Sequence, residues 1–308
     1  MMNDYALTPL EVAEILKISK NTVYELIKKG ELNAYKVGKK IRIDMVDVDE
    51  YKNSTKSNIA KRNYISQSNN EIDNSTFIIS GQDIMLDILT RHLELNCKGF
   101  HAFKSYEGSY NGLYELYQGK VSAATAHLWD GDTGQYNIPY VKRMLPGVQA
   151  VIIHLAKRMQ GFYVAKGNPK KIKCWEDLIR SDITIINREK GSGTRVLLDE
   201  HLRKLGISPS KINGYKSECA SHLAIASAVA RGEADVGIGN EKSGLQVKNI
   251  EFIPIQQESY ELIIKKEDCN KPNYQAVLNV INSDEFKTEL QGIGGYDITD
   301  TGKVAGET

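Results

Sequence analysis

Short strand-like runs alternate with helical runs through residues 76–308, and this alternation restricts the fold more than any other feature. Residues 76–79, 150–155 and 234–238 are apolar runs of strand length. Residues 84–95 and 221–231 instead repeat apolar side chains every three to four positions. Strands that alternate with helices form largely parallel sheets with helices on both faces. We therefore predict an α/β fold, and the length of this region favours two lobes over a single sheet.

Residues 53–75, with the sequence NSTKSNIAKRNYISQSNNEIDNS, separate this body (76–308) from an N-terminal head (1–52). The stretch is rich in Asn and Ser and has no apolar period, which is typical of a linker. Residues 1–62 carry 12 Lys and Arg against 9 Asp and Glu, whereas the remainder carries 28 against 30. A mildly basic head weakly favours a nucleic-acid partner.

Cysteine usage and hydropathy favour a reduced, cytoplasmic protein. The cysteines are far apart, without a CxxC pair or a His at metal-ligand spacing: Cys97, Cys174, Cys219 and Cys269. The first ten residues, MMNDYALTPL, lack the basic and apolar regions of a signal peptide. Apolar runs stay well short of the ~18 residues of a membrane span. We expect no metal site and no membrane partner.

The head has the pattern of two short helices followed by a hairpin. Thr8 followed by Pro9 is a helix start, and Ser19 can cap a second helix that ends at Gly30. Residues 32–43, LNAYKVGKKIRI, read as two strands around a turn. A helix, a tight turn, a second helix and a basic hairpin together are typical of a DNA-reading unit.

Two sets of polar side chains in the head are candidate DNA contacts. The second helix presents Lys20, Asn21, Thr22 and Lys28, and the hairpin presents Lys36, Lys39, Lys40 and Arg42. Asn pairs with adenine edges, while Lys and Arg suit phosphates, so affinity should fall with salt. The alternative is a helical hairpin with solvated lysines, which the charge pattern alone does not exclude.

Residues 8–51 resemble the excisionase-type helix-turn-helix, a relative of the MerR head. The resemblance rests on Pro9, the turn 19–22, Gly30, the wing 35–42 and the acidic closing segment. It implies a winged helix-turn-helix that binds double-stranded DNA.

Four turns in the body place a small hydroxyl residue where a strand leads into a helix. They are residues 80–83, 108–109, 191–195 and 218–222. Helix N-termini attract anions, and the edge where strands lead into helices is where open α/β sheets bind ligands. One such turn is usually a simple cap, but four favour a shared cleft. The candidate ligand contacts are Ser80, Ser109, Ser192, Gly193, Thr194, Arg195 and His222.

Some of these residues have an ordinary structural alternative. Arg195 could form a surface salt bridge, and His222 could be a structural histidine. The run GSGTR (191–195) has neither the GxxxxGK[ST] spacing of a P-loop nor GxGxxG. The sequence shows no carboxylate pair, metal-ligand cluster or Ser/His/Asp set that would indicate catalysis. We therefore expect a protein that is not an enzyme and holds no cofactor.

Several stretches of the body resemble the periplasmic-binding-protein-like domain. They include GSYNGL, AATAHLWD and the run from 187 to 239. This domain is similar to molybdate- and tungstate-binding proteins and occurs fused to helix-turn-helix heads. The resemblance implies a type II fold with lobe one at 76–155 and 255–308, and lobe two at 160–250. Segments 150–165 and 252–264 would cross between the lobes.

The resemblance also implies how a tetrahedral dianion would be held. Neutral hydroxyls and backbone N–H groups would bind it, which suits Ser80, Ser109 and residues 192–194. Arg195 and His222 depart from a neutral site. Another oxyanion or a small carboxylate therefore remains open.

Together these features predict a ligand-responsive transcription regulator that senses a small oxyanion, molybdate or tungstate. One head contacts one half-site, so we expect a homo-oligomer, a dimer or a tetramer. The alternatives are a sensor of another small anionic metabolite, an anion-delivery module linked to molybdenum cofactor synthesis, and a recombination accessory protein.

Overall fold

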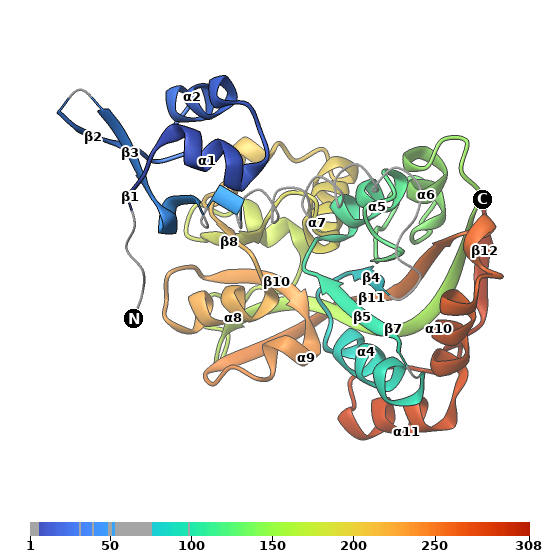
Figure 1. Cartoon of the computed structure of the whole chain (residues 1–308). Helices are drawn as coiled ribbons and strands as arrows, with labels where there is room; N and C mark the ends of the chain where they lie inside the picture. The colour runs from blue at the N-terminus through green and yellow to red at the C-terminus, as the bar shows by residue number, and fades with distance from the viewer. Residues whose placement is uncertain (1–5, 31, 39, 49–50, 53–75, 98) are drawn as a thin grey trace. The chain divides into compact units, whose positions relative to one another are not determined.

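The computed structural model of the chain describes residues 6–30, 32–38, 40–48, 51–52, 76–97 and 99–308 (Figure 1). The chain divides into two compact units, Met1–Asp73 and Asn74–Thr308. The predicted linker 53–75 lies outside the described residues.

The described part of the head contains two short helices, a small antiparallel sheet and helical residues 45–48 after the last strand. The helices are α1 (Pro9–Leu16) and α2 (Lys20–Lys28), and the strands are β1 (Ala6–Leu7), β2 (Tyr35–Val37) and β3 (Lys40–Asp44). The strand order is β1-β3-β2, with β2 and β3 forming the predicted hairpin.

Capping residues fix where the helices of the head begin. Thr8 forms a capping box with Glu11: the Thr8 N–H donates to Glu11 Oε2 (2.7 Å), and Glu11 N donates to Thr8 Oγ1 (3.4 Å). Ser19 Oγ accepts from Thr22 N (3.1 Å) at the start of α2. Val12, Val23 and Ile43 are fully buried, so both helices pack on β3 around one small core.

One sheet of nine strands runs through the body, in the order β5-β4-β6-β11-β7-β10-β8-β9 with β12 beside β7. The first three in sequence are β4 (Thr76–Ser80), β5 (His101–Ser105) and β6 (Ala123–Ala126). The strands of the second lobe are β8 (Ile185–Arg188), β9 (Glu218–Cys219) and β10 (Val236–Asn240), and β12 (Val304–Glu307) ends the chain. The pairs β4–β5, β4–β6, β8–β9 and β8–β10 are parallel, as α/β alternation predicts.

Two strands, β7 (Ala150–Ala165) and β11 (Ile250–Lys265), connect the lobes. They pair antiparallel from Ala165↔Ile250 to Ala150↔Lys265. Register shifts interrupt the pairing between Pro254 and Gln256 and between Tyr260 and Glu261. The apolar run at 150–155 is only the first part of β7, because residues 156–160 continue the ladder to Ala165.

Helices cover both faces of the sheet in each lobe (Figure 1). In lobe one, α4 (Ile84–Asn96), α10 (Pro272–Asn282) and α11 (Asp284–Ile293) share one core, and α5 (Ser109–Tyr117) and α6 (Ile138–Met144) share another. In lobe two, α7 (Gly193–Lys204) packs in one core and α8 (His222–Ala230) in another, and the four-residue helix α9 (Glu241–Gly244) follows β10.

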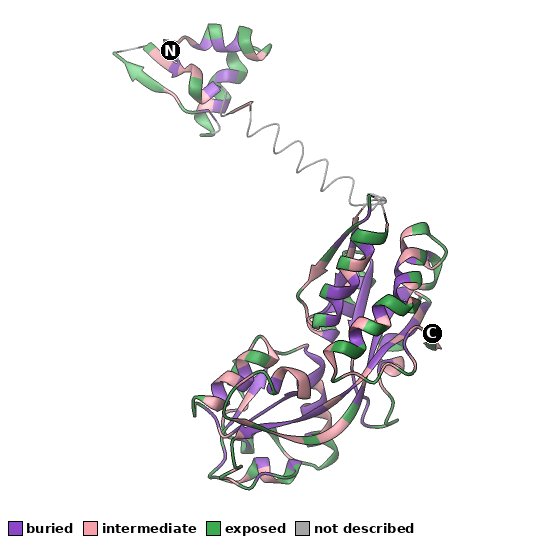
Figure 2. Cartoon of the chain, turned by 90° about the horizontal axis from the view of Figure 1, so that it is seen from below, coloured by how far each residue is buried: buried purple, intermediate pink, exposed green. Residues whose placement is uncertain are grey.

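Alternation along β7 determines which face each side chain joins. Phe162 packs with the core of α7, and its neighbour Tyr163 packs with the core of α8. Figure 2 shows the result, with buried strands between helices whose outer faces are exposed. The predicted α/β class of the body and the winged helix-turn-helix head are both confirmed. Among the described helices, none has the length and apolar character that crossing a membrane would require.

We predict that Leu89→Ala lowers the free energy of unfolding of the body by about 2–5 kcal/mol, because this side chain of α4 is fully buried. Leu95→Ala in the same helix removes the same atoms from a side chain that is 76% exposed, and should change stability by less than about 0.5 kcal/mol. Urea unfolding of both full-length variants measures the difference. Equal losses would mean that α4 does not pack on the sheet as described.

Candidate functional site

The N-termini of several helices meet at the boundary between the lobes. Asp83 caps α4, Gly108 precedes α5, Ser192 caps α7 and Ser221 caps α8. The first N–H groups of a helix have no partner inside it and carry a partial positive charge. Their convergence creates a region that favours an anion.

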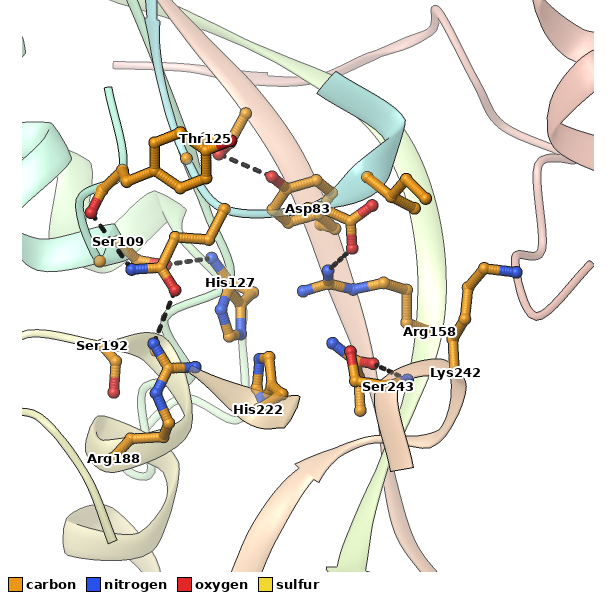
Figure 3. A pocket seen from close by; sticks show the side chains of 18 of the residues that line it. Asp83, Ser109, Thr125, His127, Arg158, Arg188, Ser192, His222, Lys242 and Ser243 are labelled. Carbon is orange, nitrogen blue, oxygen red and sulfur yellow. Dashed lines mark hydrogen bonds and ion pairs between the residues drawn. The ribbon is translucent and has the colours of Figure 1, made fainter. Parts of the chain in front are cut away.

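A cavity of about 270 Å³ lies between these helix starts (Figure 3). Its lining includes the four helix starts and the middle of the crossing strands. The charged and hydroxyl residues that line it are Asp83, Asp87, Lys104, Tyr106, Glu107, Ser109, Thr125, His127, Arg158, Arg188, Ser192, His222, Lys242, Ser243, Tyr260 and Tyr296.

A row of buried, paired charges forms the floor of the cavity. Arg158 on β7 and Glu258 on β11 are direct cross-strand partners, with Arg158 Nη2 2.5 Å from Glu258 Oε1. Glu258 Oε2 lies 2.6 Å from His127 Nδ1. On its other side Arg158 pairs with Asp83, which also accepts from the Tyr296 hydroxyl (2.6 Å). The row fixes the positions of the Arg158 and His127 side chains next to the cavity.

The charges in this row determine each other's ionisation. Burial on its own would raise the pKa of Glu258, but the positive charges of Arg158 and His127 outweigh it and lower that pKa to about 2. The guanidinium of Arg158 also lies 4.0 Å from the centroid of the Tyr260 ring. Arg158 Nε has no hydrogen-bond partner among the described residues, although it is buried. It is therefore a free donor beside the cavity.

Arg188 and His222 line the side of the cavity that belongs to lobe two. Arg188 Nη2 donates to Glu189 Oε1 (2.6 Å) and, across the cavity, to Gln82 Oε1 (2.8 Å). Burial, together with the positive charges of Arg188 and Arg158, holds the pKa of His222 well below its usual value. His222 is therefore neutral, and its Nδ1 has no partner among the described residues.

Four of the predicted ligand contacts line the cavity, and three lie beside it. Ser109, Ser192, Gly193 and His222 are in the lining, whereas Ser80, Thr194 and Arg195 are not. Ser109 Oγ accepts from His127 N (3.3 Å), so its hydroxyl proton is available to a ligand.

The three residues outside the lining have structural contacts instead. Ser80 lies against α5, where a Cβ on Gly112 would come within 2.7 Å of its hydroxyl oxygen. Thr194 Oγ1 points to Gln160 Oε1 at 3.5 Å. Arg195 pairs with Asp199 (3.1 Å) and Glu218 (2.9 Å). The sequence analysis gave a salt bridge as the alternative role of Arg195, and the structure shows this side chain in salt bridges.

Sequence reasoning missed the residues that carry most of the charge in the cavity. Asp83, His127, Arg158, Arg188 and Glu258 were not among the predicted ligand contacts. One usable signal was present, because Arg158 interrupts a strand that is otherwise mostly apolar. Charges in such positions are almost always paired or functional.

The two lobes touch directly at one rim of the cavity. Tyr110 N at the start of α5 donates to Gly191 O (2.9 Å). A Cβ on Gly108 would lie 2.7 Å from Gly191 O and 2.8 Å from the Cα of Ser192. Only glycine at 108 allows this approach of lobe one to lobe two.

The head presents most of the predicted DNA contacts on its surface. Lys20, Asn21, Thr22 and Lys28 are exposed along α2, although the Thr22 hydroxyl is 2.8 Å from Ser19 Oγ. Lys36 and Lys40 are exposed on the hairpin, and Arg42 is partly buried and donates to Ile41 O (3.0 Å). Lys39 lies outside the described residues.

No group of three or more His, Cys, Asp or Glu side chains among the described residues is arranged to hold a metal ion. The cysteines of the described ranges are all free thiols. The polar groups that the cavity offers are donors and paired charges.

Comparison with known families matches both parts of the chain. The profile of a helix-turn-helix domain matches residues 6–56, which confirms the excisionase-type head. The profile of the PBP superfamily domain matches residues 90–282. The chain belongs to this PBP superfamily domain family and carries a DNA-binding helix-turn-helix domain in front of it. Neither domain is of an enzymatic family.

A similar full-length relative and two solved structures extend this comparison. The chain is 45% identical to the Bacillus subtilis (strain 168) protein named Uncharacterized protein YvgK, over 97% of both chains. An ABC-type phosphate transport receptor from Vibrio cholerae matches with a TM-score of 0.51 at 16% identity, over 72% of this chain and 99% of that one. A mutant of ArgBP from T. maritima has a TM-score of 0.51 at 12% identity, over 71% and 94%. These structures establish the two-lobed fold.

We predict that Glu258→Gln destabilises the protein by about 3 kcal/mol at neutral pH, because lowering the pKa from 4.5 to about 2 corresponds to that energy. The contribution is fully present above pH 4.5 and is lost as the pH falls through about 2. Wild type and variant should therefore converge over this range in urea unfolding. Exposed Glu94→Gln is the control and should show no such convergence. A difference that stays constant with pH would contradict the buried ion pair.

Proposed function

We propose that this protein is a transcription regulator whose body binds a small oxyanion, molybdate or tungstate, and whose head binds DNA in response. The observation that carries the proposal is the convergence of four helix N-termini on one cavity next to buried Arg158. Free donors surround the cavity: Arg158 Nε, the Ser109 hydroxyl and the first N–H groups of the helices.

The charge balance of the cavity suits a dianion. Asp83 and Glu258 both pair with the guanidinium of Arg158, and Glu258 Oε2 also lies 2.6 Å from His127 Nδ1, so they repel an incoming anion less than free carboxylates would. Arg188 adds a second guanidinium beside the starts of α7 and α8. A phosphate receptor among the structural neighbours supports an oxyanion, and the resemblance to molybdate and tungstate binders supports this pair of ions.

A sensor of a different anionic metabolite is the second candidate. The cavity contains carboxylates as well as cations, which suits a ligand that also carries a positive group, and ArgBP has the same fold. A delivery module for cofactor synthesis fits less well, because it has no use for a DNA-binding head.

The proposed regulator acts in the cytoplasm as a homodimer or a higher homo-oligomer. A single helix-turn-helix reads one half-site, and two heads held by one assembly bind DNA far more tightly than one.

We expect molybdate or tungstate to raise the thermal midpoint of the full-length protein, whereas sulfate, phosphate and arginine do not. At one hundred times the dissociation constant, a ligand adds about 2.7 kcal/mol of stability. The same anion should change the electrophoretic shift of DNA from immediately upstream of the coding sequence. A shift with arginine alone would favour the second candidate, and no response to any of these ligands would contradict both.

Gly108→Ala should make the regulator unresponsive without unfolding it. The added methyl group would collide with Gly191 and Ser192 on the other lobe, so the lobes could not approach as closely. We expect anion affinity to fall at least tenfold, about 1.4 kcal/mol, while DNA binding by the head persists. Gly292→Ala is the matched control, since no atom lies within 4 Å of the added carbon. Unchanged affinity in Gly108→Ala would contradict closure at this rim.

A further inference from the structure

Lys242 connects a helix of lobe two to the end of a helix of lobe one. It lies in α9 of lobe two, directly after β10. Its Nζ donates to Ile293 O (2.7 Å) and Gly294 O (2.9 Å), which belong to lobe one. One side chain of lobe two thus forms two hydrogen bonds with lobe one.

The acceptors of these bonds are the last carbonyl groups of α11. A helix leaves its final carbonyls without an internal partner, and they carry a partial negative charge. The last turn of α11 contains no basic residue of its own. Gly294 N turns back to Leu290 O and Gln291 O, which leaves Ile293 O and Gly294 O to be satisfied from outside the helix. Lys242 supplies the missing positive charge from the other lobe.

The segment that Lys242 holds leads directly to the floor of the cavity. Tyr296 follows Gly294 by two residues, and its ring centroid lies 5.4 Å from Lys242 Nζ. The Tyr296 hydroxyl donates to Asp83, which pairs with Arg158. The next residue, Asp297, exchanges two backbone hydrogen bonds of 2.9 Å with Lys157 on β7. The end of α11 is therefore fixed to β7 and to the buried row of charges.

The geometry separates Lys242 from the residues that face the ligand. In Figure 3 its side chain extends away from the side of the cavity where His127, Arg188 and His222 lie. Its ammonium group is already engaged with two carbonyls. Lys242 is thus a cross-lobe helix cap beside the cavity and is not aimed at its anion-binding end.

A second connection closes the opposite rim. Gln82 of lobe one accepts from Arg188 and donates to Glu189 Oε1 (3.4 Å), both in lobe two. Gly131 and Asp132 of lobe one also bond to Glu200 (2.9 Å) and Arg203 (2.8 Å) of α7. Lys242 accounts for the side-chain bonds at the end of α11. Weakening one rim shifts the lobes towards a more open arrangement without altering the donors around the ligand.

We infer that Lys242 is a positioning residue that sets how firmly the lobes close, by capping the C-terminal end of α11 across the cavity. This inference rests on the proposed function, because closure matters only if the cavity binds a ligand. The closed arrangement retains the anion, so loss of the cap speeds ligand release. An arginine at this position keeps the charge and the donors, whereas a methionine keeps only the length.

The test measures the distance between the lobes directly. Spin labels on Cys97 in lobe one and Cys174 in lobe two, with Cys219→Ser and Cys269→Ser in the background, report this distance in the full chain. Lys242→Met should shift the distribution to longer distances, and Lys242→Arg should restore it. Lys248→Met makes the same chemical change at an exposed lysine of lobe two and serves as the control. If Lys242→Met does not fold, Lys242→Gln provides the same comparison.

Molybdate affinity and release rate are then measured on the same variants. We expect Lys242→Met to weaken binding five- to twentyfold, mainly through faster release, and Lys248→Met to bind as wild type does. An unchanged distance distribution in Lys242→Met overturns the inference, as does a loss of affinity without any change in distance. If wild type binds no molybdate, the proposed ligand fails, but the distance comparison still decides whether Lys242 holds the lobes together.

Discussion

The pairing register of β7 with β11 is the constraint on which the rest of the body depends. These two strands pass through both lobes, and their ladder places Arg158 directly opposite Glu258. Side chains alternate between the faces of a strand, so a slip of β7 by one residue against β11 would send Arg158 to the opposite face and break the buried row. The same slip would exchange Phe162 and Tyr163 between the two cores of lobe two. Core packing and the charge pair therefore select the same register.

The same register also gives each buried charge of the site an oppositely charged neighbour. Removing a charged group from water is costly unless a partner compensates for it, and here each buried charge has an opposite charge beside it. Arg158 lies between Asp83 and Glu258, and His127 completes the row. The helix N-termini then add positive potential without adding a charge that needs a counter-ion. The site combines rigid, paired side chains with backbone donors, and both are already in place before a ligand arrives.

Local signals in the sequence were enough to predict the head and the general construction of the body. Capping residues such as Thr8, Ser19 and Ser192 act within their own turn, so their roles can be read from neighbouring residues. The partners of Arg158 cannot be read in this way, because Asp83 and Glu258 lie 75 and 100 positions away along the chain. Arg195 shows the opposite error: a glycine-rich turn suggested a ligand, whereas its partner Asp199 is only one helical turn further on. The lobe boundaries and the ligand stay predictions.

The order of strands in the sheet has a consequence for how the protein is made. Lobe two comes from one continuous stretch of chain, whereas lobe one needs α10, α11 and β12, which follow residue 271. On the ribosome the head and the strands and helices of lobe two emerge before the segment that supplies Tyr296 and completes the other lobe. A nascent chain can therefore carry a finished helix-turn-helix while its ligand cavity is still incomplete. Emergence of residues 272–308, not folding of the head, is the event that completes lobe one and the side of the cavity that Tyr296 lines.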